Sequence, residues 1–381
     1  MMKKTFTFLL LLTGTLSLAA QDFEGSIKRW SDGPLTWEDF SVQQSGFPVI
    51  SRLQYNWHGA TQSSRVGNLK VVRFMTENYM NPVSSWVNPD YRNPATLLYN
   101  QTAFDYTEVC RRRLQQEIDQ GAENVSPSEL ARFYYSKADR FIQQLEEETD
   151  QGRDTALTRF YAVQVAEELA AVPEPEAVPA FRKRNFGMGM LLGYGNETYL
   201  GTPGDYFGTL HGVKMGFDFS FKDFYLYWHF VVGGSGLRRD LAAGMDWSDG
   251  HGLTGMNMEW SLGYPVVDNA WWKVSPFAGI GMADMEISFG KDADGRNITD
   301  DIGGFRVQAG LSTDLKFFRM LDLSNRPVYY YGWLTGSSRG YSEYAARLFV
   351  YAAWNRWARP VGPGWSLNFG LAFNMHVWNV R

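Results

Sequence analysis

The last part of the chain alternates large apolar residues with small or polar ones. Between Trp365 and Val377 every odd-numbered residue is large and apolar, and every even-numbered residue is small or polar. Successive side chains of a β-strand point to opposite faces, so this stretch would have one continuous apolar face. A strand of about this length reaches roughly 40 Å, enough to cross a bilayer core even when tilted. The pattern predicts a membrane-spanning strand.

The same period of two returns throughout the second half of the chain. Charged residues such as Lys316 share the parity of the small residues. We expect them to point inward, because a charge facing lipid near the bilayer midplane costs about 2–4 kcal/mol. Only a closed barrel leaves no unpaired strand edge in lipid. The pattern therefore predicts an all-β transmembrane barrel of about eight antiparallel strands, with strands near residues 186–194, 213–221, 224–233, 256–264, 272–289, 305–317, 344–355 and 365–377.

The connections between these strands alternate in length. Outer-membrane barrels have short turns on the periplasmic side and longer loops outside. The connections at 221–223 and 266–270 are short, whereas those at 195–205, 234–251, 290–301 and 356–364 are long and polar. The segment 319–342, which contains Tyr329 to Trp333, lies on the short-turn side and is nevertheless long. It is either an elaborated turn or a sign that the strand count is different.

The first half of the chain has a different pattern. Weak strand signals at 51–57 and 71–75 are followed by helical periodicity over about 94–121, 126–148 and 155–171. The second helix opens on a capping box from Ser126 to Glu129, with proline at its first position. Residues 173–183 are rich in proline and predict a stiff spacer. We therefore expect a small α+β domain over 21–172, the spacer 173–183 and the barrel over 184–381.

The N-terminus resembles an export signal. Residues 1–20 carry two lysines, an apolar run and small residues near Ala19 and Ala20, as in a secretory signal peptide. An even-stranded barrel returns both ends to one side, so the outer membrane would hold the barrel and the periplasm of a Gram-negative cell would hold 21–172. The 36 basic and 41 acidic residues give no nucleic-acid signal. The single Cys110 is expected to be a buried thiol.

Short motifs in the first half occur in a characteristic order: Leu35 to Phe40, Ser85 to Val87, Leu97 to Asp105, and Thr149 to Gly152. This order resembles a family of secreted bacterial zincin-like domains of unassigned function. That family has L-T-W-x-D-F, then a helix with H-E-Q-x-H-F-D, then a second helix that ends in T-x-H-G. Its two helix histidines suit zinc, its glutamate can activate water, and the last histidine would be a third ligand.

This chain lacks all four of those chemical groups. Tyr99, Asn100, Ala103 and Gln151 occupy the four positions, and His58 is the only histidine between residues 21 and 172. Alanine has no donor atom, and a neutral asparagine cannot act as a general base. The resemblance therefore implies a pseudo-metallopeptidase without catalytic residues, metal or other cofactor. Its relic cleft, lined by these four residues, could still hold a peptide.

Three other interpretations are open. The first concerns Asp105, Glu108, Glu148 and Asp150, which form either a calcium or magnesium site or a solvated helix face. The second concerns His376, His211 and His229, which form either a lipid-modifying hydrolase site or hydrogen-bonded filling of the barrel. Of these, His376 and His211 are expected to point inward. The third concerns Arg111, Arg112 and Arg113, which form either a binding surface for an acidic partner or lipid headgroups, or an ordinary charged helix surface.

The sequence favours a non-enzymatic role. An eight-stranded barrel is filled by its own side chains, so we expect an anchor rather than a diffusion pore. The expected partners are outer-membrane lipid and a periplasmic protein, a peptide or the cell wall, with no nucleic acid. The alternatives are a barrel that hydrolyses lipids, and a small channel or transporter.

Overall fold

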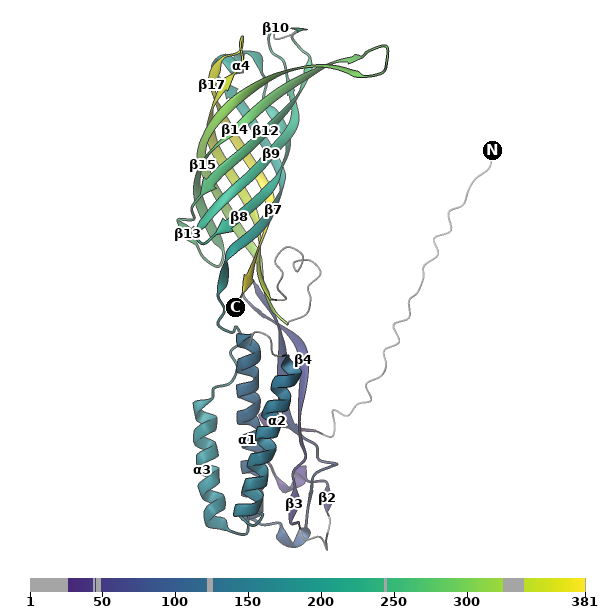
Figure 1. Cartoon of the computed structure of the whole chain (residues 1–381), viewed down its shortest axis with the longest axis vertical. Helices are drawn as coiled ribbons and strands as arrows, with labels where there is room; N and C mark the ends of the chain where they lie inside the picture. Colours follow the sequence, from purple (N-terminus) through teal and green to yellow (C-terminus); the bar gives the residue numbers. More distant parts are fainter. Residues whose placement is uncertain are drawn as a thin grey trace, which may run out of the picture. The chain divides into compact units, whose positions relative to one another are not determined.

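The computed structural model describes residues 27–43, 45, 49–121, 126–242, 245–324 and 339–380 (Figure 1). The chain divides into two compact units. Unit 1 comprises residues 1–59, 76–115 and 124–174, and unit 2 comprises 60–75, 116–123 and 175–381. The predicted signal peptide at 1–20 and the aromatic segment at 329–333 lie outside the described residues.

Unit 1 contains the three helices that the sequence predicts: α1 (Pro94–Gln120, which enters unit 2 after residue 115), α2 (Pro127–Glu148) and α3 (Thr155–Ala171). The capping box forms as expected. The Ser126 side chain accepts from the backbone N–H of Glu129, and the Glu129 carboxylate accepts from the backbone N–H of Ser126. Asp154 is a simple N-cap of α3, because its side chain accepts from the backbone N–H groups of residues 156 and 157.

The strands of unit 1 are short, apart from one long hairpin. Strands β2 (Val42–Gln43), β6 (Trp86–Val87) and β3 (Ser51–Arg52) form a three-stranded sheet in that order. Strands β4 (Tyr55–Val66) and β5 (Leu69–Met80) pair with each other and pass into unit 2 over residues 60–75. Strand β1 (Lys28–Arg29) pairs with the end of β5. Short 3-10 turns occupy Trp30–Asp32, Trp37–Asp39 and Pro89–Tyr91.

Unit 2 contains a ring of eight antiparallel strands, so the predicted number is confirmed. Each strand pairs with the next, and β17 pairs with β7 from Trp365↔Leu200 to Val380↔Lys183. The short elements α4 (Thr202–Tyr206), β10 (Leu241–Ala242), β11 (Asp246–Trp247) and β13 (Val267–Asp268) lie in the connections. The ring strands are β7 (Lys183–Leu200), β8 (Leu210–Phe221), β9 (Phe224–Gly236), β12 (Gly252–Gly263), β14 (Trp272–Lys291), β15 (Asn297–Leu323), β16 (Gly340–Trp357) and β17 (Pro363–Val380).

The alternation along these strands separates the two faces of the ring. On β17, Leu371 is 54% exposed and the next residue, Ala372, is 4% exposed. The large apolar residues point outward, and charged residues such as Lys214, Arg306 and Lys316 point into the ring, as predicted, whereas Asp284 and Arg356 lie on the outer wall. Exposed outward residues on the other strands include Leu192, Met215, Leu226, Met256, Ile280, Val307, Leu315 and Val350. Among the described residues no helix is both long and apolar enough to cross a bilayer.

The two chain ends of the ring meet at one rim, because Lys183 and Val380 are register partners. This chain-end rim carries the short β8–β9 turn and the β12–β14 connection. The opposite rim carries the longer connections with α4 and β10 (Figure 1). The segment 319–342 is partly strand, since β15 runs to Leu323 and β16 starts at Gly340. The eight-strand count holds, and residues 325–338 of this segment lie outside the described residues.

The hairpin β4–β5 joins the sheet of the ring at the end of β15. Strand β5 pairs in parallel with β15, from Leu69↔Arg319 to Arg73↔Leu323. At the hairpin tip, the Asn68 amide donates to the backbone oxygens of Ala270 and Lys316, both at 2.8 Å, and its Oδ1 accepts from Arg319 at 2.9 Å. Strand β5 therefore extends the sheet of the ring at the chain-end rim. The sequence pattern gave no sign of this pairing.

Candidate functional site

Unit 1 contains a cleft of about 550 Å³ between β3, α1 and α2. Tyr99, Asn100 and Ala103 lie on its wall, so three of the four positions identified by resemblance face one cavity. The first turns of α1 bring them together, because residues three and four apart share a helix face. The remaining lining residues come from 49–55 and from α2: Val49, Ser51, Arg52, Leu53, Gln54, Tyr55, Asp139, Ile142, Gln143 and Glu146.

Asn100 is fixed by its neighbours. Its Nδ2 donates to Ser51 Oγ at 2.9 Å and to the backbone oxygen of Thr96 at 2.8 Å, and the side chain is fully buried. The amide therefore ties α1 to strand β3. The sequence resemblance assigned this position to the glutamate of a zincin-like motif, and in the structure the amide nitrogen of Asn100 has a structural role.

Gln151 lies behind the cleft wall and does not line it. Its Oε1 accepts from the backbone N–H of Ile50 at 2.6 Å, and Ile50 precedes the lining residue Ser51. Gln151 adopts a left-handed backbone with φ of 60°. The fourth predicted position therefore supports the strand that forms one edge of the cleft.

We expect Gly152→Ala to destabilise unit 1 by about 1–3 kcal/mol. Gly152 has φ of +88°, and a Cβ there would lie 2.8 Å from Tyr99 Cβ. Denaturant unfolding of the full chain, followed by circular dichroism at the helix band, would measure the loss. Gly236→Ala is the control, because that glycine has open space around it and lacks a positive φ. Equal unfolding midpoints for both variants would contradict this account of the loop.

The two tyrosines of the cleft remain protonated over the physiological range. Burial raises the pKa of Tyr99, and the nearby Glu146 carboxylate raises it further. Burial also raises the pKa of Tyr55, whose hydroxyl donates to Asp139 Oδ1 at 2.7 Å. Neither phenol can act as a base near neutral pH, but the Tyr55 hydroxyl positions the Asp139 carboxylate.

The four carboxylates proposed for a calcium or magnesium site are not brought together. Asp105 accepts from Trp30 Nε1 and Gln101, and burial raises its pKa. Glu148 accepts from the Tyr161 hydroxyl, and Asp150 pairs with Arg153. Glu108 forms ion pairs with Arg111 and Arg112. No metal-binding group of three or more His, Cys, Asp or Glu side chains occurs in the described part of the chain. That interpretation was wrong because each carboxylate has its own local partner.

The three consecutive arginines do not form a charged helix surface. Arg111 and Arg112 are buried, and both bind the Glu108 carboxylate, at 2.6 Å and 2.9 Å. Only Arg113 is partly open, and it pairs with Glu168. The sequence shows the charges of this segment, but the burial of α1 against neighbouring elements decides their role. Two of the three residues are therefore unavailable to an external partner.

Cys110 is fully buried, as predicted, and we expect it to resist alkylation. Burial raises the pKa of its thiol to about 11, which leaves about one thiol in a thousand as reactive thiolate at pH 8. Iodoacetamide labelling followed by mass spectrometry should therefore show modification only after denaturation. Ser136→Cys, at an exposed position of α2, supplies a thiol that should react in the folded protein. Equal labelling of both thiols without denaturant would contradict this prediction.

The interior of the ring in unit 2 is filled by ion pairs. Arg347 bridges Asp218 and Asp314, and Lys273 binds Asp314 at 3.0 Å. A second group joins Lys214 to Glu259 at 3.2 Å and Arg306 to Glu197 at 3.1 Å. A third, nearer the chain-end rim, places Lys183 and Lys316 on Glu343. Buried charges occur in proteins when they are paired in this way.

The histidines divide between the two faces of the ring. His376 Nε2 lies 2.9 Å from Ser220 Oγ, and His229 Nε2 lies 2.9 Å from Asp218 Oδ1, all buried inside. The prediction that His211 points inward was wrong. It shares the parity of Val213 and Met215, is exposed, and contacts the Tyr194 hydroxyl. The Ser220–His376 pair is enclosed by side chains, which suits hydrogen-bonded filling.

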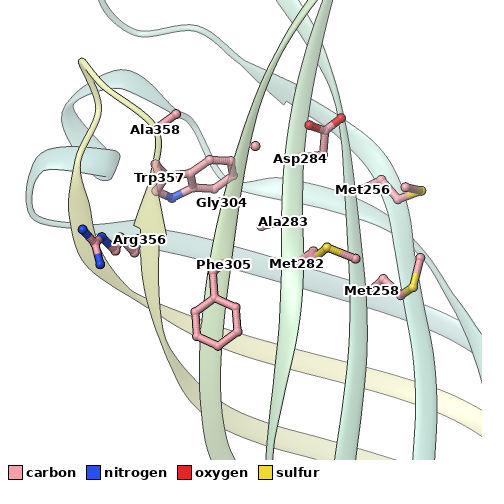
Figure 2. A pocket seen from close by; sticks show the side chains of 11 residues that line it. Met256, Met258, Met282, Ala283, Asp284, Gly304, Phe305, Arg356, Trp357 and Ala358 are labelled. Carbon is pink, nitrogen blue, oxygen red and sulfur yellow. The ribbon is translucent and has the colours of Figure 1, made fainter.

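The outer wall of the ring has a hollow of about 610 Å³ near the rim with the long connections (Figure 2). Two glycines, Gly303 and Gly304, leave room for the hollow. Its wall crosses four strands through the register partners Met258, Met282, Phe305 and Arg356. Asp284 and Arg356 lie on opposite sides of this mostly apolar surface. Sequence reasoning missed the hollow, whose only signal was the glycine pair.

No model of a protein family matches the chain. No curated protein matches it either. Solved structures with a similar barrel include the N-terminal domain of OprF from Pseudomonas aeruginosa (12% identity, 51% of this chain and 99% of that chain, TM-score 0.25). Two others are Neisserial surface protein A (10%, 52% and 99%, 0.27) and the outer membrane protein AlkL (10%, 54% and 96%, 0.24). At these values the similarity concerns the barrel fold alone.

Proposed function

We propose that the chain is an outer-membrane protein in which the barrel is an anchor and unit 1 binds an extended peptide without cutting it. The observation that carries the binding role is the cleft of about 550 Å³, which is bounded by a sheet edge and by the α1 positions Tyr99, Asn100 and Ala103. The support for the anchor comes from the barrel itself.

The outer surface of the ring favours a lipid environment. Large apolar side chains on all eight strands are exposed, and together they exceed the apolar patches that soluble monomers tolerate. The charges of the same strands are paired inside. Long connections lie at one rim and the chain ends at the other, and in known outer-membrane barrels the long connections face outward, which supports a periplasmic location for unit 1.

The filled interior favours an anchor over a pore. Arg347, Arg306 and Lys273 are at most 1% exposed, and their partners are buried with them. A continuous water path would leave such side chains open. Planar-bilayer recordings of the purified protein would reveal a channel by stable conductance steps, and such steps would replace the anchor role with transport.

The shape of the cleft favours an extended peptide. Strand β3 is the last strand of the sheet β2–β6–β3, and it lines the cleft. A free strand edge can pair with an added strand through main-chain hydrogen bonds. The polar side chains of Gln54, Gln143 and Glu146 lie around the same space and can select among ligands.

The test uses a photo-crosslinking amino acid at position 143, which is exposed and lines the cleft. Position 164, exposed on α3 and away from the cleft lining, is the matched control. The full chain in membranes is mixed with tryptic peptides from a periplasmic extract, and adducts are identified by mass spectrometry. Peptide adducts at 143 and not at 164 support the proposal. Equal yields contradict it, and so would one equivalent of bound zinc in the purified protein.

A further inference from the structure

A pocket of about 460 Å³ opens at the chain-end rim of the barrel, within unit 2. Three of its residues are the consecutive cations Arg182, Lys183 and Arg184, and a fourth cation, Lys222, comes from the β8–β9 turn. The turn is held against strand β7, because the Lys222 backbone N–H donates to the backbone oxygen of Asn185 at 2.7 Å. The remaining lining residues are Asn185, Asp223, Tyr225, Pro265, Asp268 and Trp378.

The charges of this pocket leave a cationic excess. Asp268 is bound by Lys316, and Lys183 is bound by Glu343 and lies over the rings of Tyr341 and Trp378. The side chains of Arg182 and Lys222 are exposed, and within the described ranges neither makes an ion pair. Asp223 is the one carboxylate that offsets them. Two cations are therefore open to a ligand at the pocket mouth.

Four exposed aromatic residues adjoin residues of the pocket lining in the sequence. Phe186 and Phe221 are register partners, Phe221 pairs with Phe224, and the rings of Phe224 and Tyr264 lie 5.5 Å apart. All four side chains are exposed. Exposed aromatic belts occupy the interface between lipid chains and headgroups in membrane barrels. The cations of the pocket therefore lie at the depth of the headgroups.

We propose that this pocket binds the phosphate headgroup of an anionic phospholipid in the periplasmic leaflet. The proposal rests on the membrane location of the barrel proposed above, and not on the peptide cleft of unit 1. Arg182 and Lys222 supply the charge that a phosphate requires, and the aromatic belt receives the acyl chains. A basic pocket at a headgroup interface selects anionic lipids over zwitterionic ones.

The experiment counts lipids on the full-length protein by native mass spectrometry. The protein is incubated in detergent with equal amounts of phosphatidylglycerol and phosphatidylcholine. The variant Arg182→Gln/Lys222→Gln removes the two open cations. Lys291→Gln/Arg296→Gln removes the same net charge at the far end of the β14–β15 hairpin and is the matched control. Gel migration with and without heating verifies that each barrel is folded.

We expect native protein and the control to retain phosphatidylglycerol preferentially. The double variant should lose about fivefold in preference for each cation removed. Equal preference in all three proteins would overturn the headgroup site, as would inorganic phosphate binding at the pocket without any lipid preference. Failure of folded native protein to enter phospholipid vesicles would instead overturn the membrane location, so the two failures are distinguishable.

Discussion

Arg347→Met should destabilise the barrel by about 3–5 kcal/mol, because it leaves the buried Asp218 carboxylate without its guanidinium partner and Asp314 with Lys273 alone. Arg347 is 0% exposed, its Nη2 lies 2.9 Å from Asp314 Oδ2, and its Nη1 binds Asp218. Methionine keeps most of the side-chain volume, so the loss measures charge rather than packing. Urea unfolding of protein reconstituted in phospholipid vesicles, monitored by tryptophan fluorescence, gives the free energy of unfolding.

A compensated variant separates the two causes of that loss. Arg347→Met combined with Asp218→Asn removes the uncompensated charge and keeps the Lys273–Asp314 pair, and it should recover a large part of the stability. Arg296→Met, at an exposed position on the hairpin, should leave the barrel unchanged. If this double variant is as unstable as the single one, the interior ion pairs are not the source of the effect.

Leu371→Arg should cost about 2–4 kcal/mol when the barrel is in a bilayer, because an arginine on the lipid face of a barrel is least tolerated near the midplane. Leu371 points outward near the middle of β17, with Leu348 and Tyr194 as its register partners. The same vesicle-based unfolding measures the cost. Ala358→Arg, in the β16–β17 connection, is the matched substitution outside the strands.

The comparison of Leu371→Arg with Ala358→Arg tests whether the outer face of the ring lies in lipid or in water. In water, an arginine at residue 371 would be as well solvated as one at residue 358, and both variants would be equally stable. Such equality would contradict the membrane location. A cost confined to residue 371 would support it.

The barrel was predictable from sequence because the outer face and the interior of the ring impose opposite demands on neighbouring residues. The alternation of apolar and polar residues around Leu371 reflects this difference between the two faces. The same alternation in the other segments predicted the correct number of strands. The helices were equally accessible, since Ser126 and Glu129 satisfy backbone groups within a few residues of themselves. In both cases the governing interactions are local or periodic along the chain.

The failures concern contacts between distant segments. The charges of Arg111 and Arg112 were visible in the sequence, but their burial depends on how α1 packs. His211 was assigned to the wrong face, although its parity with Val213 already placed it outside. The hollow at Gly303 requires the register of four strands, which no single segment encodes. Likewise, three cleft positions were identified by resemblance, yet the supporting role of Gln151 appeared only in three dimensions.

The parallel pairing of β5 with β15 has a consequence for biogenesis. Leu69 meets Arg319, so a segment synthesised early must wait for one made near the end of translation. Contacts of such long sequence separation form slowly, because the intervening loop must be closed first. During this delay the hairpin edge has no partner in its own chain, and an unpaired strand edge of this kind is prone to aggregation.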